Sequence, residues 1–196
     1  MKIQDGTGTG NEVKIDSNKR MHTQAVTETE SLHAAEVGDA YNISTGQIAF
    51  TGNGTLLYIK NNDERDIVVE AISIGTDGGG TYTSSLRPFV TIVRNPTAGD
   101  LITDATDAPD NVNRNFGSTK TLTADAYKGK QGGTLTGGDS LGIFQTSQAG
   151  RDYFEINMVI PKGSSIAITA TNGLSSGTVN IYCAAIVFLK DTASSN

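Results

Sequence analysis

Apolar and polar side chains alternate with a period of two through the last third of the chain. Between residues 153 and 160 one face carries large apolar side chains, namely Phe154, Ile156, Met158 and Ile160. After the turn at 161–164, residues 166–170 alternate again, and the segment 178–189 follows the turn dipeptide Asn172-Gly173. One face of this last segment carries Val179, Ile181, Cys183, Ala185, Val187 and Leu189. Alternation interrupted by regularly spaced turns is typical of antiparallel strands in a β-sandwich.

The first half of the chain contains further segments with the composition of strands. They are rich in β-branched and aromatic residues and lie at 41–44, 47–50, 56–60, 67–74 and 89–93. Thr45-Gly46 separates the first two segments, so we predict two short strands there. A polar loop at 61–65 separates the third and fourth. Two strand-like runs around a short polar loop predict a β-hairpin.

Residues 1–38 differ in composition from the rest and are predicted to form an extended N-terminal arm. The glycine-rich stretch 6–10 opens the segment, which offers few large apolar side chains for a core of its own. Val13 and Ile15 alternate as a short strand does, and the Thr-Glu-Thr-Glu sequence at 27–30 matches a helix capping box. We therefore expect an arm with a short helix near its end, lying on a neighbouring surface.

The segment from about 95 to 149 is loosely patterned, and Asp, Asn, Thr and Gly dominate it. A structureless stretch of that length is unusual within a compact domain. We interpret it as an elaborated insertion with one or two short strands at one end of the sandwich. The predicted fold class is all-β, an antiparallel β-sandwich that spans residues 39–190, with a polar C-terminal tail at 191–196.

The second face of the last predicted strand changes character along its length. It begins polar and continues with Ala184, Ile186 and Phe188. A strand that is apolar on both faces needs a second cover, and burying a side chain of this size contributes roughly 1.5–3 kcal/mol. The arm, the insertion or a neighbouring subunit can supply this cover. We predict that Ile186 and Phe188 lie in a subunit interface.

Composition and charge narrow the classes of partner. Hydrophobic residues make up 36% of the chain and aromatic residues 6%, with 23 glycines and no tryptophan, which favours a sandwich with long connections over an enzyme with a bulky pocket lining. The formal net charge of −6 argues against a nucleic-acid partner. The apolar run 184–189 is too short to span a bilayer, and residues 1–6 lack the apolar core of a signal peptide. We expect synthesis in the cytoplasm and no membrane partner.

Candidate catalytic residues are few. His22 and His33 both fall in the predicted arm, whereas a general base needs a fixed position beside its substrate. Cys183 lies on the inward face of the last strand, which favours an inert core thiol. A glycosidase groove needs aromatic walls, and the chain has no tryptophan. We therefore predict that the protein is not an enzyme and has no cofactor.

An acidic stretch is the strongest candidate for metal binding. It contains the oxygen-bearing residues Asp100, Asp104, Asp107, Asp110, Asn111 and Asn113. Calcium requires oxygen ligands of this kind, but their spacing matches no EF-hand, and surface turns use the same residues. The prediction is no metal site, with calcium binding by residues 100–113 left open.

Four sequence segments resemble virion structural proteins of tailed bacteriophages, marine ones especially. They are Val13–Met21, Tyr41–Gly46, Leu57–Asn62 and Val159–Ser165. The resemblance covers the arm, the first predicted hairpin and the final strands, but not residues 95–149. It implies a jelly-roll-like sandwich and homo-oligomers, frequently trimers, that an N-terminal segment anchors to a virus particle. It also implies synthesis in the host cytoplasm and a final location in the virion.

The expected function is therefore that of a capsid decoration, cement or head-spike protein. Its partner would be the phage major capsid protein or another virion protein, and the arm, with Val13, Ile15, Arg20 and Met21, would make the contact. The alternative is a host-recognition module of a tail or head fibre, with the insertion as the tip that binds a receptor or glycan. Weak glycan contact through Tyr82, Tyr127 or Tyr153 belongs to this alternative.

Overall fold

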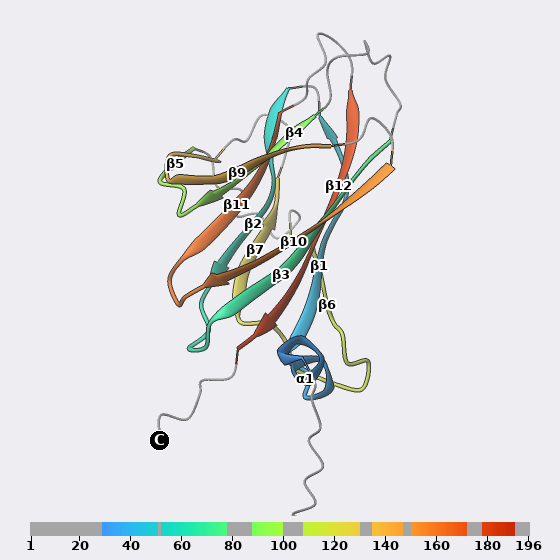
Figure 1. The fold of residues 1–196 in the computed structure, drawn as a ribbon, viewed down its shortest axis with the longest axis vertical. Helices are drawn as coiled ribbons and strands as arrows, with labels where there is room; N and C mark the ends of the chain where they lie inside the picture. The colour runs from blue at the N-terminus through green and yellow to red at the C-terminus, as the bar shows by residue number, and fades with distance from the viewer. Residues whose placement is uncertain are drawn as a thin grey trace, which may run out of the picture.

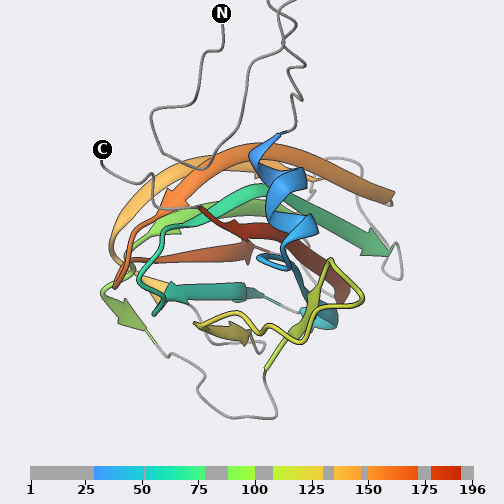
Figure 2. The same ribbon diagram turned by 90° about the horizontal axis from the view of Figure 1, so that it is seen from below.

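The computed structural model describes residues 29–50, 52–77, 88–99, 108–129, 135–146, 150–171 and 178–190. In these ranges it confirms the all-β prediction, with one helix and twelve strands (Figure 1). Two large antiparallel sheets pack face to face, and the view from below in Figure 2 shows them as two layers.

Each large sheet has five strands. The first sheet has the order β10 (Gly150–Ile160), β3 (Ile67–Asp77), β12 (Val179–Leu189), β1 (Ala40–Phe50) and β6 (Asp110–Asn113). The second has the order β7 (Ala124–Lys128), β2 (Asn53–Asn61), β11 (Ser165–Thr171), β4 (Phe89–Arg94) and β9 (Asp139–Gln145). A small third sheet pairs β5 (Ala98–Gly99) with β8 (Leu135–Thr136), and the helix α1 spans Glu30–Glu36.

The strand pairing is that of a jelly roll. β1 pairs with β12, β2 with β11, β3 with β10, and β4 with β9, all antiparallel. These pairs are the successive rungs of one long hairpin, and rolling that hairpin up distributes its strands alternately between two sheets. The short strands β6 and β7 then extend the two sheets beyond β1 and β2.

The core lies between the sheets and follows the predicted alternation. On β12 the inward side chains, from Val179 to Leu189, are all nearly inaccessible to solvent. The largest fully buried side chains are Tyr41, Ile43, Leu56, Leu57, Ile59, Ile67, Ile72, Ile74, Ile92, Ile160 and Ile168. Since each contributes roughly 1.5–3 kcal/mol on burial, this aliphatic layer is the main source of stability of the sandwich.

The predicted hairpin between residues 56–60 and 67–74 is wrong. β2 and β3 lie in different sheets, so the loop at 62–66 crosses from one sheet to the other instead of joining paired strands. The sequence pattern identified both strands because each buries one face. It could not identify their partners, because a polar loop of this length serves a hairpin and a crossover between sheets equally well.

The two short strands predicted around Thr45-Gly46 form one strand with a bulge. β1 pairs with β12 on both sides of this dipeptide, and the register shifts between Ser44 and Gln47. Gly46 has a φ of 63°, a left-handed conformation that favours glycine. The hydroxyl of Thr45 accepts a hydrogen bond of 3.0 Å from the backbone N–H of Cys183, which holds the bulge against β12.

The segment 95–149 is more closely integrated into the fold than an insertion at one end. β9 is an integral strand of the jelly roll, and β6 and β7 extend one edge of each large sheet. These strands are short and have few buried apolar side chains, so their sequence signal is weak. The interpretation of the segment as an appended insertion is therefore corrected for β6, β7 and β9.

Candidate functional site where the arm joins the sandwich

Helix α1 begins at the N-cap residue Thr29. The Thr29 hydroxyl accepts a hydrogen bond of 3.2 Å from the backbone N–H of Leu32, which satisfies one of the free donors of the first turn. The predicted helix is therefore confirmed, but its cap lies two residues after Thr27, the first residue of the predicted capping box. At its other end the chain turns at Gly38, whose φ is 79°.

The helix covers the apolar end of the first sheet's outer face. Ala34, 5% exposed, packs in one cluster with Ala40, Val68 and Phe188. Phe188 itself is 5% exposed, so it is covered from within the chain and is not available to a neighbouring subunit in this arrangement. The predicted subunit interface is corrected at Phe188. Ile186 is half-buried, and its role in an interface stays a prediction.

This packing divides the predicted arm of residues 1–38. Residues 29–38 belong to the sandwich, because α1 and the turn after it make buried contacts with the sheet. The predicted assembly residues Val13, Ile15, Arg20 and Met21, together with His22, lie outside the described residues. The prediction of an extended arm therefore applies only to residues 1–28, which lie outside the described residues.

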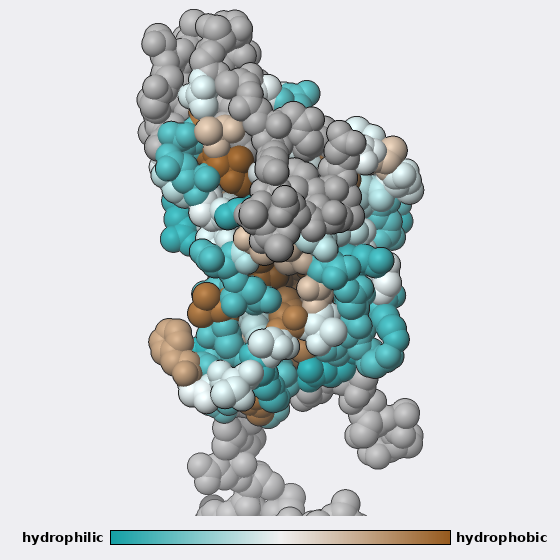
Figure 3. All heavy atoms as spheres, turned by 180° about the vertical axis from the view of Figure 1, so that it is seen from behind, coloured by the Kyte–Doolittle hydropathy of each residue, from teal (hydrophilic) through white to brown (hydrophobic). Residues whose placement is uncertain are grey.

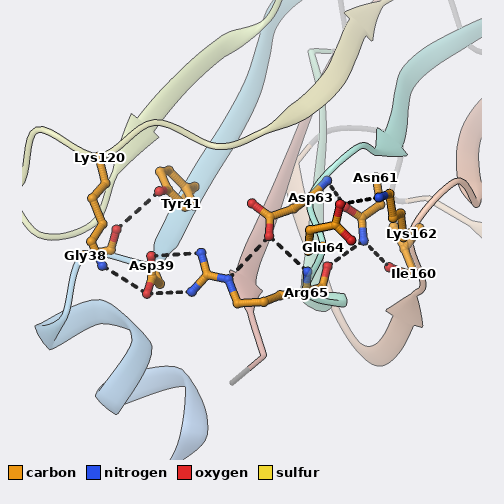
Figure 4. A network of polar contacts seen from close by, with 10 residues as sticks. All are labelled: Gly38, Asp39, Tyr41, Asn61, Asp63, Glu64, Arg65, Lys120, Ile160 and Lys162. Carbon is orange, nitrogen blue, oxygen red and sulfur yellow. Dashed lines mark hydrogen bonds and ion pairs between the residues drawn. The ribbon is translucent and has the colours of Figure 1, made fainter. Parts of the chain in front are cut away.

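Asp39 ties three separate segments together beneath α1 (Figure 4). Its carboxylate, 6% exposed, lies 2.9 Å from Arg65 of the β2–β3 loop and 3.1 Å from Lys120 of the β6–β7 connection. Burial raises the pKa of Asp39, but the hydrogen bonds and charges of Arg65 and Lys120 outweigh it and hold that pKa below its usual range. Hydrogen bonding to Asp39 likewise raises the pKa of Arg65.

Asn61 lies in the corner where the β2–β3 loop meets the β10–β11 turn. Its side chain is fully buried and donates hydrogen bonds to the backbone carbonyls of Arg65 at 2.9 Å and Ile160 at 2.8 Å. Its side-chain oxygen accepts a bond of 2.8 Å from the N–H of Asp63 (Figure 4). An ion pair between Lys162 and Glu64 joins the same turns at the surface. This corner could not be predicted from the sequence, because Asn61 is indistinguishable there from an ordinary loop asparagine.

The β6–β7 loop, residues 114–123, is held against the end of α1 by asparagine side chains. Asn113 donates hydrogen bonds to the carbonyl of Gly38 at 2.8 Å and to that of Lys120 at 3.1 Å. Asn115 donates to the carbonyl of Glu36 at 2.7 Å. The guanidinium of Arg114 lies 3.5 Å from the Glu70 carboxylate. These contacts fix the loop relative to the helix and β3.

Phe116, in this loop, is 95% exposed. Other apolar side chains nearby in the sequence or on α1 are about half exposed, among them Leu32 at 51% and Val112 at 52%. Between the grey atoms, the face in Figure 3 is mostly hydrophilic, and its hydrophobic residues form small separate groups. The exposure of Phe116 could not be predicted from the sequence, because its neighbours along the chain do not determine it.

A hollow of about 420 Å³ lies on the outer face of the first sheet. Arg151 on β10 and Tyr182 on β12 are in register on either side of Gly75, which has no side chain between them. Ser73 accepts a hydrogen bond from Arg151 on the floor of the hollow. This hollow could not be predicted from the sequence, because it depends on the pairing of β10 with β3.

The remaining chemical candidates lie apart from one another where the structure describes them. Cys183 lies in the core, as predicted, and burial raises the pKa of its thiol to about 12. His33 lies on α1, and Asp110, Asn111 and Asn113 lie on β6, while Asp100, Asp104 and Asp107 are outside the described residues. Among the residues that the structure describes, no group of three His, Cys, Asp or Glu side chains is placed to hold a metal ion.

The predicted tyrosines have different surroundings. Tyr127 stacks on Tyr58 with ring centroids 6.3 Å apart, whereas Tyr153 is 53% exposed on the outer face of β10. Tyr82 is not among the described residues. No helix in the described ranges has the length and apolar character needed to cross a membrane.

The fold and the site together define a class of protein, a jelly-roll β-sandwich whose N-terminal segment enters through a helix docked on the first sheet. Comparison with models of protein families, with curated proteins and with solved structures finds no match for this chain.

Proposed function

We propose that the chain is a non-enzymatic structural subunit of a bacteriophage virion, a capsid decoration, cement or head-spike protein. The observation that carries the proposal is the docking of α1. Thr29 and the helix fix the point at which residues 1–28, whose sequence has few large apolar side chains, join the jelly roll. Jelly rolls are a common architecture of viral capsid domains, and the sequence resemblance supports the same class.

In this proposal the segment 1–28 binds the phage major capsid protein or another virion protein. Val13, Ile15, Arg20 and Met21 make the contact, and the sandwich self-associates, with a trimer favoured. Ordering such a segment costs conformational entropy, so each single contact is modest. Repeated attachment across a symmetric shell raises the overall affinity without any new contact.

The test is attachment of a truncated chain to virus particles prepared without this protein. Residues 29–196 keep α1 and its cap, and we expect them to unfold at the same temperature as the full chain but to remain in the supernatant when particles are sedimented. A full-length chain with Val13→Asp and Ile15→Asp is the matched second variant, because it keeps the length of the arm. We expect it to remain in the supernatant as well. Undiminished sedimentation of both variants with the particles would show that the arm is not the anchor.

A host-recognition module is the second candidate, and the hollow between Arg151 and Tyr182 favours it. A guanidinium, a serine hydroxyl and an exposed aromatic ring around a shallow hollow offer hydrogen bonds and a stacking surface to a sugar. Loss of a glycan-array signal in Tyr182→Ala, but not in Tyr153→Ala, would support recognition. The number of copies per particle separates the candidates, because decoration requires hundreds and a fibre a few dozen at most.

A further inference from the structure

We infer that the hollow on the outer face of the first sheet binds an acidic sugar, with Arg151 on its carboxylate and Tyr182 against its ring. This ligand class belongs to the second candidate function, recognition of a glycan at the hollow, on which the inference rests. Neither residues 1–28 nor a virus particle is needed for such binding.

The hollow exists because Gly75 lies between two long side chains. β10, β3 and β12 are neighbours in that order (Figure 1), and Arg151 and Tyr182 are the strand partners of Gly75 on either side. A Cβ atom on Gly75 would lie 3.7 Å from Cδ2 of Tyr182 and 3.5 Å from the carbonyl oxygen of Gly150. The tyrosine side chain therefore borders the space above the glycine. The volume of about 420 Å³ is within the range of pockets that hold small ligands.

Arg151 gives the hollow a positive charge. It is the only charged residue among the described residues that line the hollow. Its Nε donates a hydrogen bond to the hydroxyl of Ser73, a neutral group, and the two terminal amino groups carry four further N–H donors. None of the ion pairs between described residues includes Arg151. A guanidinium placed in this way suits the planar, two-oxygen geometry of a carboxylate.

The described carboxylates of β10 lie away from Arg151. Asp152 follows it directly along the strand, so the two side chains leave opposite faces of the sheet. Glu155 shares the face of Arg151, but four residues of strand place it about 13 Å away. In a chain with a net charge of −6, the hollow is therefore a locally cationic part of the described surface. This favours an anionic ligand over a neutral or cationic one.

The other side chains around the hollow suit the ring and the hydroxyl groups of a sugar. Tyr182, 40% exposed, offers an aromatic face to the apolar side of the ring and a hydroxyl at its tip. The hydroxyl of Ser44 accepts a hydrogen bond of 3.4 Å from the N–H of Gly46, and that of Ser73 accepts one from Arg151. A hydroxyl that accepts a hydrogen bond also has an O–H of its own, which can be donated to a ligand.

The experiment follows the amide chemical shifts of the isotope-labelled full chain during titration with three small probes. D-glucuronate has a ring and a carboxylate, D-glucose lacks the carboxylate, and acetate lacks the ring. We expect saturable shifts at Ser73, Gly75 and Tyr182 with glucuronate. The dissociation constant should be at least about 10-fold weaker for each of the other two probes, because each loses one half of the recognition.

Two substitutions separate the charge of the hollow from its shape. Arg151→Gln removes the charge, so this variant should bind glucuronate at least about 10-fold more weakly. Gly75→Val fills the space beside Tyr182 and should weaken glucuronate by a similar factor. Its unfolding temperature should be unchanged or higher, because a Cβ there makes ordinary van der Waals contacts and valine suits a strand better than glycine. Lys128→Gln, on β7 of the other sheet, is the matched control for the loss of one positive charge and should bind glucuronate normally.

The outcomes distinguish the ligand class from the function on which it rests. Equal affinity for glucose and glucuronate would overturn the role of the carboxylate but leave recognition of a glycan in place. Equal affinity for acetate and glucuronate, or undiminished binding by Arg151→Gln, would overturn the assignment of the site. Saturable shifts with neither sugar would overturn it together with the observation that favours host recognition. No particle is present, so the capsid proposal stands or falls separately.

Discussion

Gly38 lies where the end of α1, the start of β1 and the loop 114–123 meet. A Cβ atom there would lie 2.3 Å from the hydroxyl oxygen of Ser118 and 2.7 Å from its Cβ, distances too short for van der Waals contact. The carbonyl of Gly38 accepts hydrogen bonds from Tyr41 at 3.2 Å and Asn113 at 2.8 Å. One residue without a side chain thus allows three segments to pack together, and its left-handed φ fits the same requirement.

Replacing Asp39 by asparagine removes the charge shared by Arg65 and Lys120. We expect a loss of about 1–3 kcal/mol in the free energy of unfolding at pH 7, because hydrogen bonds to a charged and nearly buried group are lost. The pKa of Asp39 is lowered in the folded chain, so its contribution is complete above the unfolded pKa of about 3.9 and disappears as the pH falls through the folded value. The stability difference between the two proteins should therefore shrink below about pH 4.

Chemical denaturation at several pH values measures this difference. Asp139→Asn is the control, because Asp139 pairs with Arg94 at the surface, where ion pairs contribute about 0–1 kcal/mol. A stability difference for Asp39→Asn that stays constant down to pH 2 would contradict the electrostatic explanation.

Replacing Asn61 by alanine removes its hydrogen bonds to the buried carbonyl of Ile160 and to the partly buried carbonyl of Arg65. An unsatisfied buried group costs about 1–3 kcal/mol, so we expect a loss of about 1–3 kcal/mol in unfolding free energy. Asn62→Ala is the matched control, since this neighbouring side chain is exposed. Thermal unfolding followed by circular dichroism compares the two, and equal stability of both variants would show that the corner contributes little.

Elements differ in how far the sequence determines them. The alternation in β10, β11 and β12 predicted these strands, because each buries one face of a two-layer sandwich. Pairing was not predictable in the same way. The contact of β2 with β11 joins segments about 100 residues apart, and no local pattern encodes such a partner.

The candidate site was less predictable than the fold. Its helix was expected from its capping sequence, and the need to cover Phe188 was recognised. That α1 provides the cover depends on the position of Ala34 over β12, which only the three-dimensional path of the chain determines. The exposed position of Phe116 and the corner at Asn61 have no sequence pattern of their own, because both depend on segments that are distant along the chain.

The docking of α1 can be tested with a charge in its buried face. Ala34→Glu places a carboxylate against Val68 and Phe188, and we expect about 1–3 kcal/mol of destabilisation together with faster proteolytic cleavage around residues 29–38. Leu32→Glu, on the exposed face of the same helix, should change neither property appreciably. Limited proteolysis with mass spectrometry locates the cleavage, and equal resistance of both variants would show that α1 is not a stable part of the sandwich.

At the scale of the whole molecule, the first and last strands are neighbours. β12 lies between β3 and β1 in the middle of the first sheet, and the backbone N–H of Leu189 donates a 2.9 Å hydrogen bond to the backbone carbonyl of Asp39. We expect a chain ending at residue 178 to lose its fold, because β3 and β1 would each lose β12 as a partner and the first sheet would be divided into two pairs of strands. A chain ending at Lys190 should unfold cooperatively like the full chain, as circular dichroism can measure. A folded 1–178 chain would show that the first sheet forms without its centre.

The central position of β12 also limits the order in which the sandwich can assemble during synthesis. A ribosome makes β1 and β3 long before β12, so the inner edges of these two strands have no partner in the emerging chain until β12 is made. Helix α1 likewise cannot complete its packing until Phe188 on β12 has been translated. The first sheet is therefore completed from its centre, by the strand of that sheet that is made after all the others.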